Sequence, residues 1–346
     1  MGRTKEIMPL SAALPAGQKP TLKTIAQMSG LAVPTVSRAL NDAPDIGSET
    51  KKTIRRIADE IGYVPNRAGV RLRTGRTNVI SLVMSTEHDN HTARLISSVA
   101  GGLQGTRYHL NVTPYFPGDD IMKPVRYIVE TRSADAVILN QIEPEDPRVA
   151  YLMENKVPFA THGRTNWSDK HAFYDFDNAA FGRKAMDLLV KRGRKSVFVV
   201  APPLAQTYSQ HLLNGLREVA DTHGVQLDVL EGVTSDSDTH SIATATTEKL
   251  RSDVKYDAIV AASNSAAMAS VVSVEGLGLK VGENVDVIAK EDVPFLRLFR
   301  QEILTLPESV GSAGVFLARA AIQAIQNPEM TPMQFLEVPE HGGVPR

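Results

Sequence analysis

The segment that most constrains the fold of this chain is residues 21–41, TLKTIAQMSGLAVPTVSRALN. Apolar side chains recur at helical spacing over 22–28, Gly30 provides a turn, and a second helical pattern runs over 33–41. Two short helices joined by such a turn form a helix-turn-helix, whose second helix enters the major groove of DNA. The segment therefore predicts a DNA-binding head.

The charge of the chain is divided unevenly along its length. Residues 19–76 contain 11 Lys and Arg against 5 Asp and Glu, a net charge of +6, although the whole chain of 346 residues has a net charge of −1. Residues 77–346 therefore carry a net charge of −8. A small basic module on a large acidic body favours a polyanionic partner for the module alone.

The sequence pattern divides the chain into four parts. Residues 1–18 are expected to form a flexible extension, and residues 19–65 form the head, with a third amphipathic helix over 53–61. Residues 66–76, NRAGVRLRTGR, are basic and contain two glycines, which is typical of a hinge. Residues 77–346 form the body.

The body alternates short apolar runs with amphipathic helical stretches. Such runs are typical of buried strands in parallel sheets. Repeated strand–helix units predict two doubly wound α/β subdomains with a cleft between them. The runs are VISLVM (79–84), AVILN (136–140), SVFVVA (196–201), DAIVAA (257–262) and VDVIA (285–289).

Several classes of protein are disfavoured by what the sequence lacks. There is no cysteine, which removes disulfides and thiolate metal sites. No apolar run is long enough to span a membrane and no secretory signal precedes the head, so we expect a cytoplasmic protein. No HExxH, Walker, GxSxG or dinucleotide-binding glycine motif is present, so we expect neither an enzyme nor a bound metal or cofactor.

Six motifs stand out along the chain, namely TLKTIAQMSGLAVPTVSRALN (21–41), IADEIGYVPNRA (57–68), RLRTGRTNVISLV (71–83), DFDNAAFG (175–182), NGLREVADTHG (214–224) and AASNSAAMASV (261–271). Taken together, they resemble those of the lactose-repressor (LacI/GalR) family of bacterial transcription regulators, in collinear order from residue 19 to about residue 337. The resemblance implies a body like that of periplasmic binding proteins and a homodimer on a near-palindromic DNA operator. It also implies a small effector in the cleft, by default a carbohydrate or sugar acid. Repression is the commoner outcome in the family, and induction and co-repression by the effector stay equally open.

The resemblance implies three base-reading positions in the second helix, which are its first two residues and one four residues later. Arg38 would make a bidentate contact with guanine, worth about 1–3 kcal/mol of discrimination, unless it is a plain solvated side chain. Val33 and Pro34 would read by shape and by contact with a thymine methyl, or would merely start the helix. The other DNA contacts implied for the head, most of them to phosphates, are Thr21, Leu22, Thr35, Ser37, Asn41, Lys51, Asn66 and Arg67.

The hinge has one implied DNA contact and two departures from the family. Leu72 matches a leucine that wedges into the minor groove and kinks the duplex, and the alternative is a leucine packed in a linker. Gly69 and Val70 stand where alanine and a polar residue are usual, and glycine weakens a helix by about 1 kcal/mol relative to alanine. We therefore expect a hinge helix that forms only on DNA. Ahead of the third helix, Gly47 replaces a usual serine, so Ser48 is expected to cap that helix instead.

The turn EHDNHT at 87–92 is unusually polar and follows the first predicted strand of the body. The family usually has an asparagine, a proline and an aromatic residue there. The substitution suggests a hydroxyl-rich or charged ligand, and the alternative is a solvated loop without a ligand role. The candidate ligand-binding residues of this turn are His88, Asp89, Asn90 and His91.

The rest of the predicted cleft departs from the family at several positions. Arg164 is retained, either to bind ligand or to anchor its loop. Leu212 replaces a usual sugar-binding arginine, so nearby polar residues are expected to substitute for it. Glu291 is the acidic candidate in AKED (289–292), unless it forms a surface ion pair with Lys290. The further ligand-binding candidates are Tyr208, Gln210, His211 and Asn264.

Two other functions share parts of these features. A solute-binding protein of a transport system has the same two-lobed body, but the basic head and the missing signal sequence argue against it. A sugar-processing enzyme with a fused DNA-binding head would need catalytic motifs that the sequence lacks.

The end of the chain, EVPEHGGVPR, has none of the leucine heptads that tetrameric members of the family append, so a dimer is expected.

Overall fold

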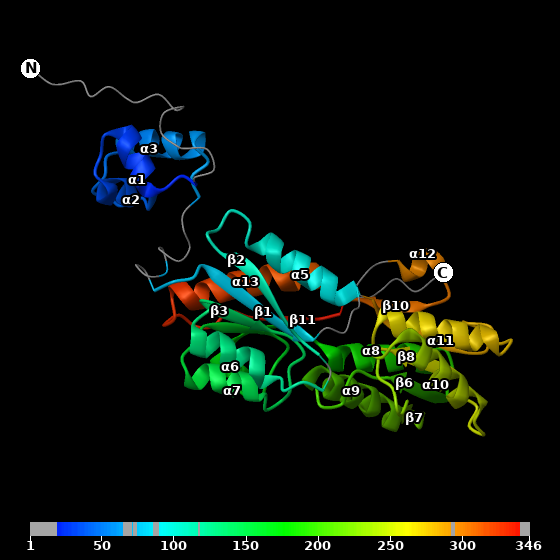
Figure 1. The fold of residues 1–346 in the computed structure, drawn as a ribbon. Helices are drawn as coiled ribbons and strands as arrows, with labels where there is room; N and C mark the ends of the chain where they lie inside the picture. The colour runs from blue at the N-terminus through cyan, green and yellow to red at the C-terminus, as the bar shows by residue number, and fades with distance from the viewer. Residues whose placement is uncertain are drawn as a thin grey trace, which may run out of the picture. The chain divides into compact units, whose positions relative to one another are not determined.

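The computed structural model describes residues 19–64, 71, 75–85, 90–116, 118–291 and 295–339, with the backbone alone at 90, 297 and 299. The chain divides between Thr77 and Asn78 into two compact units, the head and the body, which are taken separately below (Figure 1). Among the described residues, no helix is both long and apolar enough to cross a membrane.

Three helices form the head, as the sequence predicts. The first begins after Thr21, whose hydroxyl accepts a hydrogen bond from the Thr24 amide at 3.3 Å while the Thr24 hydroxyl accepts from the Thr21 amide at 3.1 Å. Gly30 ends this helix with a φ of 68°, a left-handed value that glycine adopts without strain. The helices are α1 (Leu22–Ser29), α2 (Val33–Leu40) and α3 (Ser48–Glu60).

The start of α3 differs from the expectation. Gly47 is the residue that precedes the first helical turn, and no side chain caps it. The prediction that Ser48 caps α3 is therefore wrong, because Ser48 is the first residue of the helix itself rather than its N-cap.

A small apolar core holds the head together. Ile25, Val36 and Ile54 are fully buried, one from each helix, and Met28 and Ile57 join the same cluster. A helix of eight residues is marginal by itself in water, whereas each fully buried isoleucine or valine contributes about 1.5–3 kcal/mol. The orientation of α2 is therefore fixed by packing rather than by its own helical propensity.

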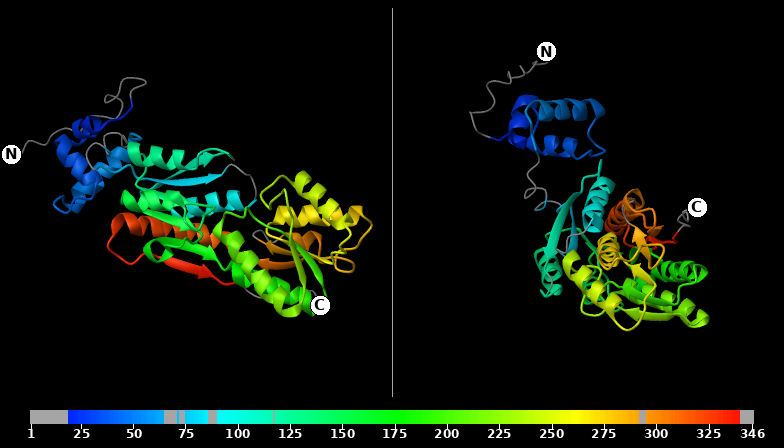
Figure 2. Two further views of the ribbon diagram at one scale, coloured as in Figure 1. Left: turned by 90° about the horizontal axis from the view of Figure 1, so that it is seen from below. Right: turned by 90° about the vertical axis from the view of Figure 1, so that its right-hand side faces the viewer.

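The first lobe of the body is a six-stranded sheet of order β11-β5-β4-β3-β1-β2 in which every pairing is parallel (Figure 2). All four residues of β3 and of β4 are buried, as expected for strands covered on both faces. The strands are β1 (Val79–Ser85), β2 (His109–Tyr115), β3 (Ala136–Leu139), β4 (Phe159–His162), β5 (Ala172–Phe176) and β11 (Gln334–Glu337). The helices are α5 (Asn90–Gly102), α6 (Met122–Thr131), α7 (Pro147–Glu154), η2 (Ser168–Lys170) and α13 (Val310–Gln326).

The second lobe is a five-stranded parallel sheet of order β10-β9-β8-β6-β7. Each of the five strands predicted from apolar runs is present, and the prediction of two doubly wound α/β subdomains is confirmed. The strands are β6 (Ser196–Val200), β7 (Gln226–Val229), β8 (Ala258–Ala261), β9 (Asp286–Glu291) and β10 (Leu304–Pro307). The helices are α8 (Asn178–Lys191), α9 (Thr207–His223), α10 (Thr239–Arg251), α11 (Asn264–Gly276) and α12 (Leu296–Phe299).

The two lobes are not successive segments of the chain. After β5 the chain enters α8 of the second lobe, and after β10 it returns to the first lobe as α13 and β11, which pairs with β5. Helix α13 packs against α5 and against the central strands of the first sheet. The carboxyl ends of the strands carry the loops from which a ligand site is usually built in such sheets.

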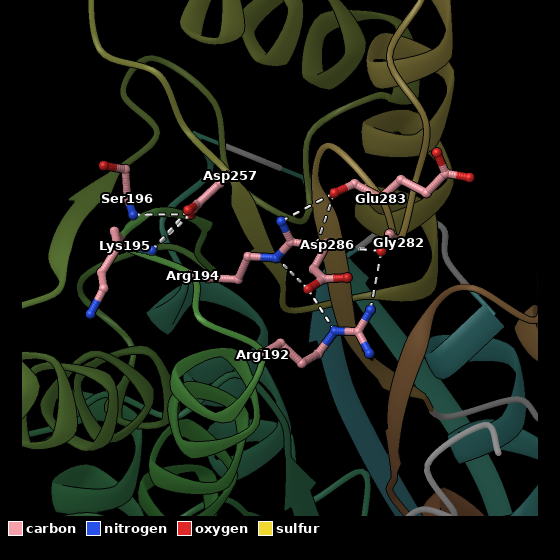
Figure 3. Close-up of polar contacts among 8 residues, drawn as sticks. All are labelled: Arg192, Arg194, Lys195, Ser196, Asp257, Gly282, Glu283 and Asp286. Atoms are coloured by element: carbon pink, nitrogen blue, oxygen red, sulfur yellow. Dashed lines mark hydrogen bonds and ion pairs between the residues drawn. The ribbon is translucent and has the colours of Figure 1, made fainter.

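A charged cluster closes the amino-terminal edge of the second sheet (Figure 3). The fully buried Asp286 carboxylate, at the start of β9, accepts from Arg192 Nε at 2.7 Å and from Arg194 Nε at 2.6 Å. Nearby, the Asp257 carboxylate accepts from the backbone amides of Lys195 and Ser196. These bonds tie the end of α8 to β6 and β9, so we assign this edge a structural role.

Glycines allow two helices of the second lobe to approach closely. A Cβ atom on Gly215 of α9 would lie 2.1 Å from the Ala179 carbonyl oxygen, and one on Gly182 of α8 would lie 2.5 Å from the Leu212 carbonyl oxygen. Both obstacles are backbone atoms, which cannot rotate away. The buried Leu212 therefore packs at this contact and belongs to the core of the lobe.

We expect Gly215→Ala to destabilise the body by about 2–3 kcal/mol, because the added methyl group would force α8 and α9 apart. Gly276→Ala is the matched control in the same lobe, since a Cβ there meets nothing within 4 Å. The control should be neutral or slightly stabilising. Urea unfolding of the purified variants measures both, and equal stabilities would contradict the close contact.

Candidate functional sites

The predicted base readers lie on the outward face of α2. Val33 is 39% exposed, and Pro34 and Arg38 are also exposed, whereas Val36 and Ala39 on the opposite face are buried in the head core. Pro34 sits in the first turn of the helix, where its missing amide proton is not needed. The three side chains are thus accessible to a DNA duplex, and their roles as base readers stay predictions.

Arg38 has an ionic partner within the head. Its Nη2 lies 2.6 Å from Asp45 Oδ1, and the two side chains are 58% and 49% exposed. Exposed ion pairs of this kind are worth about 0–1 kcal/mol, so a guanine or a phosphate can displace the carboxylate at little cost.

Most of the predicted phosphate contacts also have structural roles. Thr21 caps α1, and Asn41 Nδ2 donates to the Ser37 carbonyl at 2.5 Å at the end of α2. Ser37 is only 9% exposed, whereas Lys51 Nζ reaches the surface and donates to the Asp42 carbonyl at 3.3 Å. Leu22 packs against the head core and Thr35 is half-buried. Asn66, Arg67 and Leu72 lie outside the described residues.

A cavity of about 450 Å³ lies at the carboxyl ends of the strands of both lobes. Each lobe contributes the ends of several strands and the loops or helix starts that follow them. The lining residues of the first lobe are His91, Thr92, Asn140, Gln141, His162, Gly163 and Asp175. Those of the second lobe are Asn178, Tyr208, Ser235, Asp236, Ser237, Asp238, Thr239, Ala262, Ser263, Ser265, Lys290 and Glu308.

The one lysine among these lining residues is neutralised within the cavity wall. Lys290 Nζ lies 2.9 Å from Glu308 Oε2, and their side chains are 12% and 4% exposed. Burial alone would raise the pKa of Glu308, but Lys290, with smaller contributions from His91 and His162, outweighs that effect and lowers the pKa to about 2. Glu308 is therefore ionised at any physiological pH and cancels the charge of Lys290.

Asp175 is held by an arginine that stands behind it. Arg164 Nε donates to Asp175 Oδ2 at 2.7 Å, and the side chains are 25% and 5% exposed. Burial raises the pKa of Asp175 to about 6, against the opposing effect of Arg164. Asp175 is thus mostly ionised at neutral pH but takes up a proton in mildly acidic solution.

His162 presents a hydrogen-bond acceptor to the cavity. Burial lowers its pKa to about 3, with His91 as a further cause, so the ring is neutral. His162 Nδ1 lies 3.2 Å from Asn140 Oδ1, which accepts from an Nδ1–H and leaves Nε2 as an acceptor. The His91 ring stacks on the His162 ring, with centroids 5.3 Å apart.

Two of the predicted ligand-binding residues, His91 and Tyr208, line the cavity. Arg164 and His211 stand in the wall behind it, where Arg164 Nη2 donates to His211 Nδ1 at 3.4 Å, so Arg164 matches the anchoring alternative. Burial and the charge of Arg164 lower the pKa of His211.

The remaining candidates fall into two groups. Gln210 is exposed and Asn264 and Glu291 are buried outside the lining, whereas His88 and Asp89 lie outside the described residues and Asn90 is described by its backbone alone.

The alternative that Lys290 and Glu291 form a surface ion pair is wrong. Successive residues of a strand point to opposite faces, so Lys290 faces the cavity and pairs with Glu308, whereas Glu291 accepts from the Leu296 amide at 3.1 Å. Sequence reasoning also missed Asn140, Gln141 and the loop 235–239. The usable signal for Asn140 and Gln141 was their position at the end of the predicted strand 136–140, where parallel sheets place ligand sites. The loop 235–239 follows β7, which the sequence did not predict.

Comparison with known proteins gives the same family for head and body. The model of bacterial regulatory proteins, lacI family, matches residues 21–66. The model of periplasmic binding proteins and sugar binding domain of LacI family matches residues 79–334. The HTH-type transcriptional regulator AglR of Rhizobium meliloti (strain 1021) is 29% identical over 323 residues, which cover 91% of this chain and 90% of that protein.

Two solved structures extend the comparison to the fold. A transcriptional regulator CelR–cellobiose complex is 22% identical with a TM-score of 0.67, covering 93% of this chain and 98% of that one. A lac repressor dimer bound to operator and the anti-inducer ONPF is 17% identical with a TM-score of 0.80, covering 93% and 97%. At these identities the matches establish the architecture of the body and not its ligand.

The raised pKa of Asp175 gives a pH-dependent prediction. Because the folded protein holds this proton more tightly than the unfolded chain, the stabilisation is present at low pH and is lost as the pH rises through about 6. Relative to the unchanged protein, Asp175→Asn should therefore gain about 2 kcal/mol of stability between pH 4.5 and pH 7.5. Urea unfolding across that range tests this, with the exposed Asp221→Asn as control. A difference that does not change with pH would refute it.

Proposed function

This chain belongs to the LacI family of bacterial regulatory proteins, and from that premise we propose a regulator whose affinity for DNA depends on a sugar bound in the body cavity. The observation that carries the proposal is the presence, in one chain, of an accessible α2 reading face and a polar cavity between two lobes. Such a regulator acts in the cytoplasm, where its operator is.

Two copies of the chain are proposed to bind one near-palindromic operator. A helix-turn-helix reads one half-site, so a two-fold symmetric site requires a dimer. In each half-site Arg38 contacts guanine, while Val33 and Pro34 read by apolar contact. Residues 66–76 serve as the hinge, with Leu72 as the minor-groove wedge. Ligand in the cavity changes the populations of the body's states and thereby the spacing of the two hinges.

The charges of the cavity favour an uncharged effector over a sugar acid or sugar phosphate. The lining residues include four carboxylates, those of Asp175, Asp236, Asp238 and Glu308, and the charge of Lys290 is already balanced. An anionic ligand would meet net negative charge at short range. Sugar hydroxyls, in contrast, donate well to carboxylates and to the His162 Nε2 acceptor.

The size of the cavity and one relative point to a sugar of more than minimal size. A volume of 450 Å³ lies within the range of about 300–1,000 Å³ that is usual for small-molecule sites. The neighbouring CelR structure is a complex with cellobiose, an uncharged disaccharide. We therefore favour an uncharged oligosaccharide as the effector class of this chain.

The alternatives from the sequence are not retained. A transport binding protein would have no use for the head, which matches the regulatory family model over residues 21–66. An enzyme is disfavoured because the similar curated proteins AglR and CelR, which the chain matches over nine-tenths of its length, are transcriptional regulators.

Base-sequence selection from random duplexes tests the DNA-reading part. Arg38→Ala should lose preference for guanine at one position of each half-site by about 5- to 100-fold, because a bidentate contact is worth about 1–3 kcal/mol. Arg56→Ala removes an equal charge from α3, where Arg56 pairs with Glu60, and should leave the preferences intact. Asp45→Asn should strengthen operator binding, since it releases Arg38. Unchanged base preference in Arg38→Ala would remove it from the reading face.

Calorimetric titration tests the effector class. Cellobiose and maltose are compared with their aldonic acids, which have nearly the same shape but carry a carboxylate. The unchanged protein should bind a neutral disaccharide better than its acid. Glu308→Gln should improve binding of the acid by about tenfold, because Lys290 then has no counter-charge. The exposed Glu302→Gln is the control, and preference of the unchanged protein for the acid would contradict the proposal.

A further inference from the structure

The segment that follows β3 touches the second lobe at two points. The Ile142 carbonyl accepts from the amide of Thr207, at the start of α9, at 2.8 Å. Beside it, Gln141 Nε2 donates to Asp236 Oδ2 at 3.3 Å, and both of these side chains line the cavity. The second contact joins the lobes through side chains only, at the place where a ligand would bind.

The backbone of Gln141 has a conformation that glutamine rarely adopts. Its φ is 55°, in the left-handed region, which costs about 1–2 kcal/mol for a residue with a Cβ atom. Arg148 holds this conformation, since its Nη2 donates to the Gln141 carbonyl at 2.8 Å and to the Asn140 carbonyl at 3.2 Å. Strained backbone that is fixed by its surroundings in this way is concentrated at functional positions.

The arginine that holds Gln141 is itself fixed. Arg148 is 1% exposed and pairs with the fully buried Asp146 through two bonds, of 2.7 Å from Nη2 and 3.0 Å from Nε. Asp146 also caps α7 through the Arg148 amide at 2.9 Å. Burial opposes the charge of Arg148, but the bonds to Asp146 raise its pKa, so the guanidinium stays charged.

The side chain of Gln141 is oriented from its other end. Tyr115, the last residue of β2, donates its hydroxyl to Gln141 Oε1 at 3.1 Å. With the amide oxygen engaged in the first lobe, the amide NH₂ group is directed toward Asp236 in the second lobe. Gln141 is thus a rigid donor presented across the cavity by one lobe to the other.

We propose that the contact between Gln141 and Asp236 is a latch that favours the approach of the two lobes, and that effector binding acts on DNA affinity in part through it. The inference rests on the proposed function for the regulatory role of the motion, but the latch itself is a property of the body alone. A hydrogen bond to a charged group shifts an equilibrium between open and closed lobes by about tenfold or more.

Distance measurement between spin labels tests the latch without sugar or DNA. The chain has no native cysteine, so Glu130→Cys on α6 and Glu248→Cys on α10 give two specific labelling sites on exposed positions of different lobes. Gln141→Glu places a carboxylate against Asp236 and keeps the acceptor for Tyr115. The distance distribution should move to longer values and broaden, as the closed population falls by about tenfold or more.

A second substitution should restore the hydrogen bond that Gln141→Glu removes. In Gln141→Glu with Asp236→Asn, donor and acceptor are exchanged across the gap, so the hydrogen bond can form again with reversed polarity. The original distance distribution should return. Gln104→Glu, at an exposed position after α5, is the matched control for adding a carboxylate to the first lobe and should change nothing. If Gln141→Glu impairs folding, Gln141→Gly opens the latch while removing the backbone strain.

Each outcome of this experiment decides about the latch. An unchanged distance distribution in both Gln141→Glu and Gln141→Gly would overturn it, and so would failure of the Asp236→Asn exchange to restore the distance. A separate titration with operator DNA distinguishes this from failure of the proposed function. If the latch opens as expected but operator affinity and its response to sugar stay the same, the latch is real and has no part in regulation.

Discussion

The parallel direction of the strands in both sheets is the constraint on which the functional part of the body depends. Because all strands of a parallel sheet end at the same edge, the segments that follow β3, β4 and β5 in one lobe collect together, and segments of the second lobe do the same. Chain crossings after β5 and β10 hold these two edges against each other. At the opposite edge of the second sheet, Asp286 is paired with two arginines. The polar groups at the cavity edge are therefore the ones that can bind a ligand.

Charge balance within the cavity wall then determines what the site can bind. The Lys290 side chain is largely buried, and a lone ammonium group there would be costly; Glu308 offsets that cost and also removes the lysine as a receptor for anions. Arg164 likewise pairs with the buried Asp175 and balances its charge. The wall therefore offers hydrogen-bond acceptors without a net positive charge, which suits hydroxyl groups better than carboxylates or phosphates.

The sequence predicts the parts of this structure that depend on local pattern. The helices of the head follow from helical periodicity and Gly30, and the five apolar runs became strands because burial on both faces selects them. The pair of Lys290 and Glu308 could not be found in this way, because residues 18 positions apart meet only when β9 and β10 are paired. The role of Gln141 could not be predicted for a similar reason. Nothing in the local sequence shows that a polar residue after a strand adopts a positive φ or faces Asp236.

The weakness of the hydrogen bond between Gln141 and Asp236 suits a regulatory role. A ligand can shift an equilibrium only by its difference in affinity for the two states, so a contact worth many kcal/mol would lock the lobes regardless of effector. The bond from Gln141 to Asp236 is long, at 3.3 Å, and its acceptor lines the cavity, so sugar hydroxyls can either join or replace it. The buried Arg148 and Asp146 make the donor rigid, which keeps the entropic cost of forming the contact low. A rigid support with a weak, ligand-accessible contact is therefore the arrangement that lets a small sugar change the state of the body.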